Sequence, residues 1–217
     1  MSTREVLIYS HFERFWHWTQ MALIFTMLVT GFAIHGLHDW ISFDRAVTLH
    51  TLAALALLGL WVLATFWLFT TGNWKHYLPT ARGLGQVVRF YSYGIFLGER
   101  HPYRKAFWRK HNPLQAIAYL ALKGVLFPLI WASGIAYLLY FAWGDNPGAA
   151  AWLQWVALVH TATAYAILAF VVMHVYMLTI GGSFAHHVTP MLTGFDKVEL
   201  SPEEEAYLIQ DEPSHIR

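Results

Sequence analysis

Histidines are the residues of this chain whose number and placement most clearly suggest chemistry. The sequence contains 13 histidines and no cysteine. His17 lies between two tryptophans in FERFWHWT, while His50, His160 and His174 lie within long apolar runs. A polar side chain in a membrane-spanning segment is costly, so each is a candidate functional residue. Neutral imidazole is also a common metal ligand. The four histidines are therefore candidate metal ligands, and the alternative at each position is a buried, hydrogen-bonded structural histidine.

The absence of cysteine narrows this chemistry. Disulfides, iron–sulfur clusters, thiolate-ligated haem and c-type haem attachment all need cysteine, so this chain supplies none of them. No Gly-rich cofactor loop or hydrolase metal motif is present, and nothing predicts a nucleic-acid partner. Any redox group that this chain binds is expected to be held by imidazole without a covalent tether.

The elements that position the histidines are four apolar blocks. The chain is 57% hydrophobic and only 12% charged, and charged residues make up about 25% of ordinary globular domains. A hydrocarbon core of about 30 Å needs roughly 20 helical residues, and each block supplies them. The sequence predicts an all-α membrane protein, a bundle of four transmembrane helices. The blocks cover residues 15–37, 46–71, 114–143 and 149–180, and the third is interrupted by Lys123 and Pro128.

Charge distribution predicts the orientation. The loop of residues 72–113 carries eight Lys and Arg residues, whereas residues 38–45 and 144–148 together carry only Arg45. The positive-inside rule places the long loop and both termini in the cytoplasm, with the chain in a bacterial inner membrane. Within the loop, ARGLGQVVRFYSYGIF is expected to form an amphipathic helix on the lipid surface.

Two regions are expected along the chain. Residues 1–190 form the membrane domain, and residues 191–217 form an acidic cytoplasmic tail with seven Asp and Glu residues from Asp196 onward. This tail is expected either to order against a partner or to remain a solvated segment.

The histidines pair by depth once the topology is applied. His160 and His174 are 14 residues apart on one helix, so they share a face and lie about 21 Å apart along its axis. Because neighbouring spans run in opposite directions, His17 is level with His174 on the cytoplasmic side, and His50 is level with His160 on the periplasmic side. Two bis-imidazole sites stacked across a membrane are what two b-type haems require. Such iron has no open position, which favours electron transfer.

Small residues near these positions agree with a flat porphyrin, although close helix packing explains small residues equally well. Ala54 and Ala164 each follow a proposed ligand by four residues. Glycines in the other spans are Gly31, Gly59 and Gly134.

His35 is the main alternative ligand. It lies 18 residues after His17, five helical turns, and so shares its helix face near the periplasmic end. Together with His38, it is a candidate for binding a haem propionate or for replacing one of the assigned periplasmic ligands.

The motifs FERFWHWT, AVTLHTLAA, KHNPLQ and ALVHTATAYAILAFVVMHVYM resemble, in order and spacing, the cytochrome b (gamma) subunit of membrane-bound formate dehydrogenases. The wider group includes the b-type cytochromes of nickel–iron hydrogenases and thiosulfate reductases. The resemblance covers residues 8–190. It implies a four-helix subunit with two haem b groups that passes electrons between an Fe–S partner and quinone. It also implies the ligand pairs that topology predicts: His17 with His174, and His50 with His160.

The resemblance further implies a quinone pocket, for menaquinone or ubiquinone. The family's N-x-x-Q feature falls on Asn112 and Gln115, whose side chains would hydrogen-bond a quinone carbonyl. The alternative for Asn112 is a helix N-cap, because Pro113 follows it. Lys123, within the third block, is expected to snorkel toward the cytoplasm, neutralise a propionate or assist quinone protonation.

Two departures from the formate dehydrogenase pattern are plain. That pattern has glycine where this chain has Ala54 and Ala164, which places the formate branch in doubt but not haem binding. The tail is acidic rather than basic, which indicates a different partner surface.

The predicted function is a dihaem b-type cytochrome that anchors a respiratory oxidoreductase in the membrane. It would carry electrons between quinone and an Fe–S subunit, and a separate catalytic subunit would act on the substrate. One alternative is a stand-alone quinol oxidase of the bacterial cytochrome b561 type. A second is a histidine-rich metal transporter, which needs ligands that converge near the membrane midplane.

Overall fold

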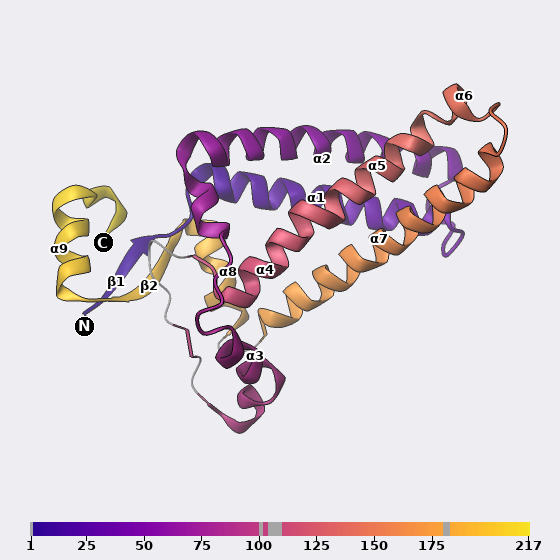
Figure 1. The fold of residues 1–217 in the computed structure, drawn as a ribbon. Helices are drawn as coiled ribbons and strands as arrows, with labels where there is room; N and C mark the ends of the chain where they lie inside the picture. The colour runs from indigo at the N-terminus through magenta and orange to yellow at the C-terminus, as the bar shows by residue number, and fades with distance from the viewer. Residues whose placement is uncertain (1, 100–101, 104–109, 180–182) are drawn as a thin grey trace. The chain divides into compact units, whose positions relative to one another are not determined.

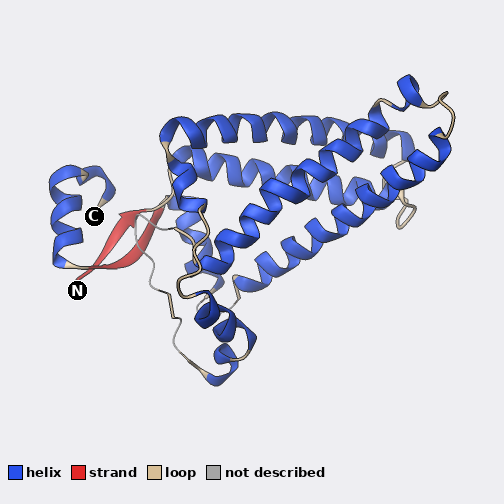
Figure 2. Ribbon diagram, in the orientation of Figure 1, coloured by secondary structure: helices blue, strands red, loops and turns tan. Residues whose placement is uncertain are grey.

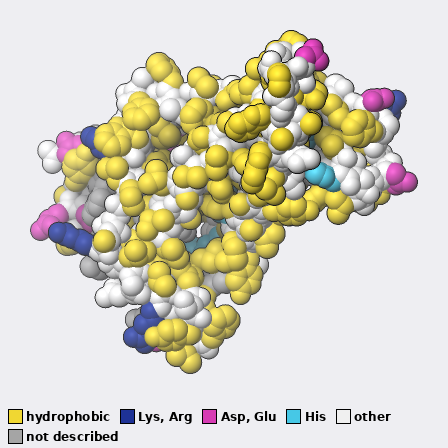
Figure 3. Space-filling view, turned by 45° about the vertical axis from the view of Figure 1, so that its right-hand side comes forward, with side chains coloured by type: hydrophobic (Ala, Val, Ile, Leu, Met, Phe, Trp, Pro, Cys, Tyr) yellow, Lys and Arg dark blue, Asp and Glu magenta, His cyan; other side chains and the backbone are white. Residues whose placement is uncertain are grey.

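The computed structural model describes residues 2–99, 102–103, 110–179 and 183–217. The described chain is mainly helical (Figures 1 and 2), and it contains four helices long and apolar enough to cross a membrane. Hydrophobic side chains cover most of the face shown in Figure 3. The predicted all-α membrane fold with four spanning helices is confirmed. The spans are α1 (His11–Ile34), α2 (Phe43–Thr71), Pro113–Leu138 and α7 (Ala149–Met177).

Helix α1 begins four residues earlier than its apolar block suggests, because a capping box starts it. The Ser10 amide donates to the Glu13 carboxylate at 2.8 Å, and the Glu13 amide donates to the Ser10 hydroxyl at 3.3 Å. At the other end Gly36 adopts a φ of 71°, a left-handed conformation that glycine reaches at little cost. His17 therefore lies inside the second turn of the helix rather than at its mouth.

The third span is interrupted where the sequence predicted. It consists of α4 (Pro113–Ala121), a π-helical turn (Leu122–Leu126) and α5 (Phe127–Leu138). In the π turn the Phe127 amide donates to the Leu122 carbonyl, five residues back. Pro128 has no N–H for the usual bond to the carbonyl four residues earlier, and this favours the widened turn. The inserted residue rotates the faces of α5 relative to α4.

Helix α7 is continuous, so His160 and His174 lie on one unbroken helix, as expected. Its last residue is Met177, whereas the apolar block extends to residue 180, and residues 180–182 lie outside the described residues. Part of the basic loop also lies outside them, namely Arg100, Arg104, Lys105 and Arg109.

The chain divides into two compact units. Unit 2 combines residues Thr19–Phe66 with Leu120–His174 and therefore takes a segment from each of the four spans. Unit 1 combines Met1–Trp18, Trp67–Tyr119 and Val175–Arg217, which are the helix ends, the long loop and both terminal regions.

Unit 1 contains a small sheet that the apolar blocks did not predict. Strand β1 (Ser2–Leu7) pairs antiparallel with β2 (Phe195–Leu200), in a register that sets Ser2 opposite Leu200 and Leu7 opposite Phe195. A further bridge joins Val6 to Ile216, so both edges of β1 are occupied by the chain's own C-terminal region. The tail thus orders against the chain's N-terminal strand, an arrangement that the sequence analysis did not consider.

The acidic residues of the tail stabilise the start of a helix. Helix α9 (Pro202–Asp211) begins with a capping box between Ser201 and Glu204, and its first turn is acidic, which complements the helix dipole. Glu205 accepts hydrogen bonds from Ser2 at 2.5 Å and from Arg4 at 2.6 Å. These contacts join the tail to β1 over a small apolar core made of Val6, Ile8, Val198, Leu200 and Leu208.

The predicted amphipathic loop helix is present as α3 (Leu84–Ser92). Val87 and Phe90 are buried on one side, whereas Val88 is exposed. The remaining short elements are η1 (Asn73–Tyr77), η2 (Gly94–Leu97), α6 (Tyr140–Trp143), α8 (Phe184–Thr193) and η4 (Pro213–His215).

The small apolar core between β1 and the tail predicts how substitutions in α9 affect the tail. Leu208 is fully buried, whereas its neighbour Ile209 is 56% exposed. We expect Leu208→Ala to destabilise the β1–β2–α9 assembly by about 2–5 kcal/mol, and Ile209→Ala to change it by at most about 0.5 kcal/mol. Limited proteolysis of the purified protein measures the difference as faster cleavage within the tail. Equal cleavage of both variants would show that this core does not hold the tail.

Candidate functional site

The apolar bundle of unit 2 lines a partly open cavity of about 600 Å³. This volume lies within the range of about 300–1,000 Å³ that small-molecule and cofactor sites occupy. All four spans contribute to its wall, and most of the lining is apolar. Its polar side chains include two of the predicted ligands, His50 from α2 and His160 from α7.

His50 and His160 face each other with ring centres 6.3 Å apart and ring planes inclined by 59°. An imidazole nitrogen binds a metal ion at about 2 Å, and the ring centre lies about 1.1 Å behind that nitrogen. Two imidazoles on opposite sides of one metal ion therefore have ring centres about 6 Å apart. The observed separation matches bis-imidazole ligation. Of the sequence-predicted ligands, these two are the pair that the structure brings together.

Each imidazole contacts a buried hydroxyl through its Nδ1 atom. Thr30 Oγ1, from α1, lies 3.0 Å from His50 Nδ1, and Ser133 Oγ, from α5, lies 3.0 Å from His160 Nδ1. Thr30 is 1% and Ser133 6% exposed. Neither hydroxyl stands out in the sequence, because neither residue type is unusual in an apolar helix. A ligand's second nitrogen is commonly hydrogen-bonded in this way, so Nε2 is the atom left for the cavity.

Glycines keep space open beside both rings. A Cβ added to Gly31 would lie 3.6 Å from His50 Cε1, and one added to Gly134 would lie 3.4 Å from His160 Cε1. Both glycines line the cavity, as do Ala54 and Ala164. The small residues that the sequence singled out near these ligands therefore border one cavity, whereas Gly59 is exposed.

The donor set suits a haem better than a bare metal ion. Among the described residues no group of three or more His, Cys, Asp or Glu side chains is arranged to hold a metal. Zinc in proteins normally takes at least three protein ligands, whereas a porphyrin supplies four nitrogens and leaves two axial positions for the chain. Two facing imidazoles, small residues and an apolar wall fit haem b, and they do not favour the transporter alternative.

His35 also lines the cavity, together with Tyr137. It directly follows the last residue of α1, and its backbone N–H donates to the Gly31 carbonyl at 3.0 Å. His38 Nε2 donates a hydrogen bond to the Val29 carbonyl at 2.9 Å, and the His38 ring stacks on Trp40.

The second predicted pair is divided between the units. His174, in unit 2, stacks on Phe170 with ring centres 6.0 Å apart. His17, in unit 1, meets Trp18 edge to face at 5.2 Å. Their pairing stays a prediction.

Asn112 and Gln115 cap helix α4. The backbone N–H of Gln115 donates to Asn112 Oδ1 at 2.9 Å, and the backbone N–H of Asn112 donates to Gln115 Oε1 at 3.1 Å. Both side-chain oxygens thus satisfy backbone N–H groups, which is the capping alternative. Their NH₂ groups are the donors left for other partners, and Asn112 Nδ2 lies 3.4 Å from the Tyr91 hydroxyl.

Aromatic residues gather beside this cap in unit 1. The His111 ring meets Tyr77 at 4.9 Å and Tyr119 at 4.8 Å, both edge to face. Burial raises the pKa of Tyr77, and the nearby Glu13 charge raises it further. Burial likewise raises the pKa of Tyr9. Because a raised pKa keeps a phenol protonated, both side chains are O–H groups at ordinary pH.

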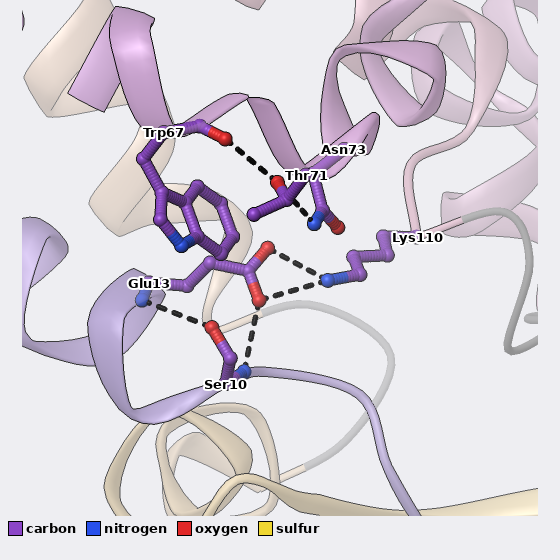
Figure 4. A network of polar contacts seen from close by, with 6 residues as sticks. All are labelled: Ser10, Glu13, Trp67, Thr71, Asn73 and Lys110. Atoms are coloured by element: carbon purple, nitrogen blue, oxygen red, sulfur yellow. Dashed lines mark hydrogen bonds and ion pairs between the residues drawn. The ribbon is translucent and has the colours of Figure 1, made fainter. Parts of the chain in front are cut away.

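A buried ion pair lies in the same unit (Figure 4). Lys110 Nζ donates to both carboxylate oxygens of Glu13, at 2.7 and 2.8 Å, and the two side chains are 8% and 6% exposed. Beside it, Asn73 donates to the Thr71 hydroxyl, which donates to the Trp67 carbonyl. The pair joins the start of α1 to Lys110, near the end of the long loop, and nothing in the sequence pattern predicted it.

Comparison with known proteins identifies the family. A family model described as prokaryotic cytochrome b561 matches residues 8–194. The chain belongs to the prokaryotic cytochrome b561 family. It is 29% identical over 199 residues, covering 89% of this chain and 75% of the relative, to the predicted cytochrome YdhU of Escherichia coli (strain K12). No solved structure matched the chain.

Membership of the prokaryotic cytochrome b561 family confirms the resemblance to bacterial membrane b-type cytochromes. The family implies a b-type haem and electron transfer within a membrane, and the cavity between His50 and His160 fits such a group. Membership of this family is compatible with both a subunit of a larger complex and a stand-alone cytochrome.

Removing one charge of the Glu13–Lys110 ion pair (Figure 4) should destabilise the protein more than removing both charges. Glu13→Gln leaves the Lys110 charge buried without its counter-charge, so we expect a loss of about 3–5 kcal/mol of stability. The matched control is the exposed pair Arg89–Glu99, at 2.8 Å, where Glu99→Gln should cost at most about 1 kcal/mol. Unfolding in detergent, followed by circular dichroism, measures both. Adding Lys110→Met to Glu13→Gln should recover much of the loss, and no recovery would argue against the buried charge as its cause.

Proposed function

We propose that this chain is a dihaem b-type cytochrome that carries electrons between the quinone pool and a partner oxidoreductase. The observation that supports it most is the pair of imidazoles facing each other at 6.3 Å across an apolar cavity. Family membership supports a membrane electron carrier. The number of haems, the quinone and the partner complex are the proposed part.

His50 and His160 are the proposed axial ligands of one haem. Haem b supplies reversible one-electron transfer when bound there. The two imidazoles would fill both axial positions and leave no site for a small-molecule substrate. The apolar lining excludes water, and Gly31 and Gly134 leave room for a flat ring. His35 and Tyr137, on the cavity wall, are the proposed partners of a propionate.

His17 and His174 are the proposed ligands of the second haem. His174 follows His160 by 14 residues on the continuous helix α7, a separation of about 21 Å along the axis. With this spacing, the two proposed sites would lie at different depths of the membrane. Electrons would then pass from one site to the other across the bilayer.

The proposed quinone site adjoins the start of α4. Because the side-chain oxygens of Asn112 and Gln115 cap the helix, their NH₂ groups are the donors proposed for a quinone carbonyl. Protonated Tyr77 and the neighbouring His111 provide further groups able to hydrogen-bond a quinone or a quinol. Menaquinone and ubiquinone share the carbonyl that this site would recognise.

The partner is proposed to dock on the cytoplasmic side. The basic loop of residues 72–113 supports a cytoplasmic location for that loop and for both termini, in the inner membrane. An Fe–S subunit and a catalytic subunit would meet the folded parts of unit 1 there. The family description also favours a second candidate, a stand-alone quinol oxidase. Copurification of an Fe–S subunit from the native membrane separates the two candidates.

The ligand assignment predicts two classes of variant. His50→Ala and His160→Ala should each remove the same haem or make it high-spin, while His17→Ala and His174→Ala should affect the other haem only. Electron paramagnetic resonance of the purified protein resolves the two low-spin signals. His38, bonded to the Val29 carbonyl, provides the control, and His38→Ala should keep both signals. A haem lost in His35→Ala and retained in His50→Ala would overturn the choice of His50.

Haem stoichiometry is a separate prediction. The purified chain should carry two haem b groups, both extractable by acidified solvent because the sequence has no cysteine to tether them. A pyridine haemochrome assay against quantified protein measures the ratio. One haem per chain would contradict the dihaem proposal and leave the His50–His160 site alone.

A further inference from the structure

Two short sequence patterns each occur twice among the helices that line the cavity. Helices α2 and α7 each present the pattern H-T-x-x-A, at His50–Ala54 and His160–Ala164. Helices α1 and α5 each present a hydroxyl residue followed by glycine, at Thr30–Gly31 and Ser133–Gly134. No internal repeat is obvious in the sequence as a whole, because the correspondence involves only a few positions.

The two histidine helices are also buried at equivalent positions. On α2 the residues three and seven positions after His50 are buried, namely Ala53 and Leu57. On α7 the corresponding residues after His160, Thr163 and Ile167, are buried as well. The two histidine helices thus turn equivalent faces inward, and each imidazole meets one hydroxyl and one glycine.

The hydrogen bonds of the hydroxyls determine which nitrogen carries the proton. Thr30 Oγ1 lies 2.7 Å from the Thr26 carbonyl, and Ser133 Oγ lies 2.7 Å from the Leu129 carbonyl. A hydroxyl has one hydrogen, and a carbonyl accepts but cannot donate. Each hydroxyl therefore donates to its own helix, and its oxygen is left to accept from the Nδ1–H of the facing histidine.

We propose that Thr30 and Ser133 are positioning residues that fix the Nδ1–H tautomer and the orientation of His50 and His160, and thereby set the properties of the haem between them. The inference rests on the proposed role of these histidines as axial ligands. With Nδ1 protonated and restrained, Nε2 carries the lone pair that an iron ligand needs. The site is then preorganised on both sides before the haem arrives.

The hydroxyls also affect the electronic properties of the ligands. A hydroxyl that donates to a carbonyl is polarised into a better acceptor, and an accepted Nδ1–H bond makes imidazole a more basic ligand. A more basic ligand favours ferric over ferrous iron. Removing the acceptor should therefore raise the midpoint potential of this haem and weaken its binding.

The test compares Thr30→Val, which keeps the side-chain shape but removes the hydroxyl, with Thr30→Ser, which keeps the hydroxyl. Thr26→Val is the matched control, because the Thr26 hydroxyl also donates to a carbonyl of α1, that of Ala22, but Thr26 is exposed. Ser133→Ala and Ser133→Thr repeat the comparison on the other side. The measurements are a redox titration of each haem and haem titration into the haem-free full chain.

We expect Thr30→Val and Ser133→Ala each to raise the potential of the His50–His160 haem and to weaken haem binding about 10- to 100-fold. Thr30→Ser, Ser133→Thr and Thr26→Val should retain both values. The potential of the second haem should stay constant in every variant, which separates a local effect from misfolding. Unchanged potential and affinity in both Thr30→Val and Ser133→Ala would overturn the inference.

Failure of the inference is distinct from failure of the proposed function. If His50→Ala and His160→Ala lose the haem while the hydroxyl variants change nothing, the ligands are correct and the hydroxyls serve only their own helices. If His50→Ala and His160→Ala both retain two low-spin haems, the ligand assignment itself is wrong. A potential shift of equal size in Thr26→Val would assign the effect to helix stability rather than to the histidine contact.

Discussion

The burial of two imidazoles face to face within apolar helices is the constraint on which the rest of this site depends. A histidine in hydrocarbon surroundings needs a partner for each ring nitrogen, because water is absent. Thr30 and Ser133 supply one partner for each ring, at 3.0 Å in both cases. The remaining nitrogens face a cavity of about 600 Å³. Hydroxyls and glycines therefore recur together, because each ring needs an acceptor and an open space beside it.

Local backbone features place these groups. The π turn before α5, favoured by Pro128, sets the rotation of that helix, and hence the side on which Ser133 and Gly134 lie. On α1, Thr30 and Gly31 occupy the last turns before the left-handed Gly36 ends the helix. The two hydroxyl–glycine pairs thus reach equivalent positions from helices with different irregularities.

Unit 1 is stabilised by interactions of a different kind from those of unit 2. It gathers polar and charged groups where the spans end, and several of these groups pair with one another. The Glu13–Lys110 pair is almost fully buried, and the tail closes on β1 through both strand pairing and Glu205. A buried ion pair is not by itself strongly stabilising, but removing one partner is costly, so it holds α1 and the loop in one arrangement.

The sequence by itself determined the four spans, the break near Pro128 and the amphipathic helix α3, and it selected His50 and His160 as candidate ligands. Apolar length, turn residues and the cost of a polar group in a membrane are local properties, so they can be read without coordinates. Membership of a b-type cytochrome family was also visible in the motifs. Only the tertiary structure decided that Thr30 and Ser133 contact the imidazoles, that Lys110 pairs with Glu13 across 97 positions, and that the acidic tail pairs with β1. Hydroxyls and charges are common residue types, and their partners lie far away in sequence. Their roles therefore depend on which helix faces and chain ends the fold brings together.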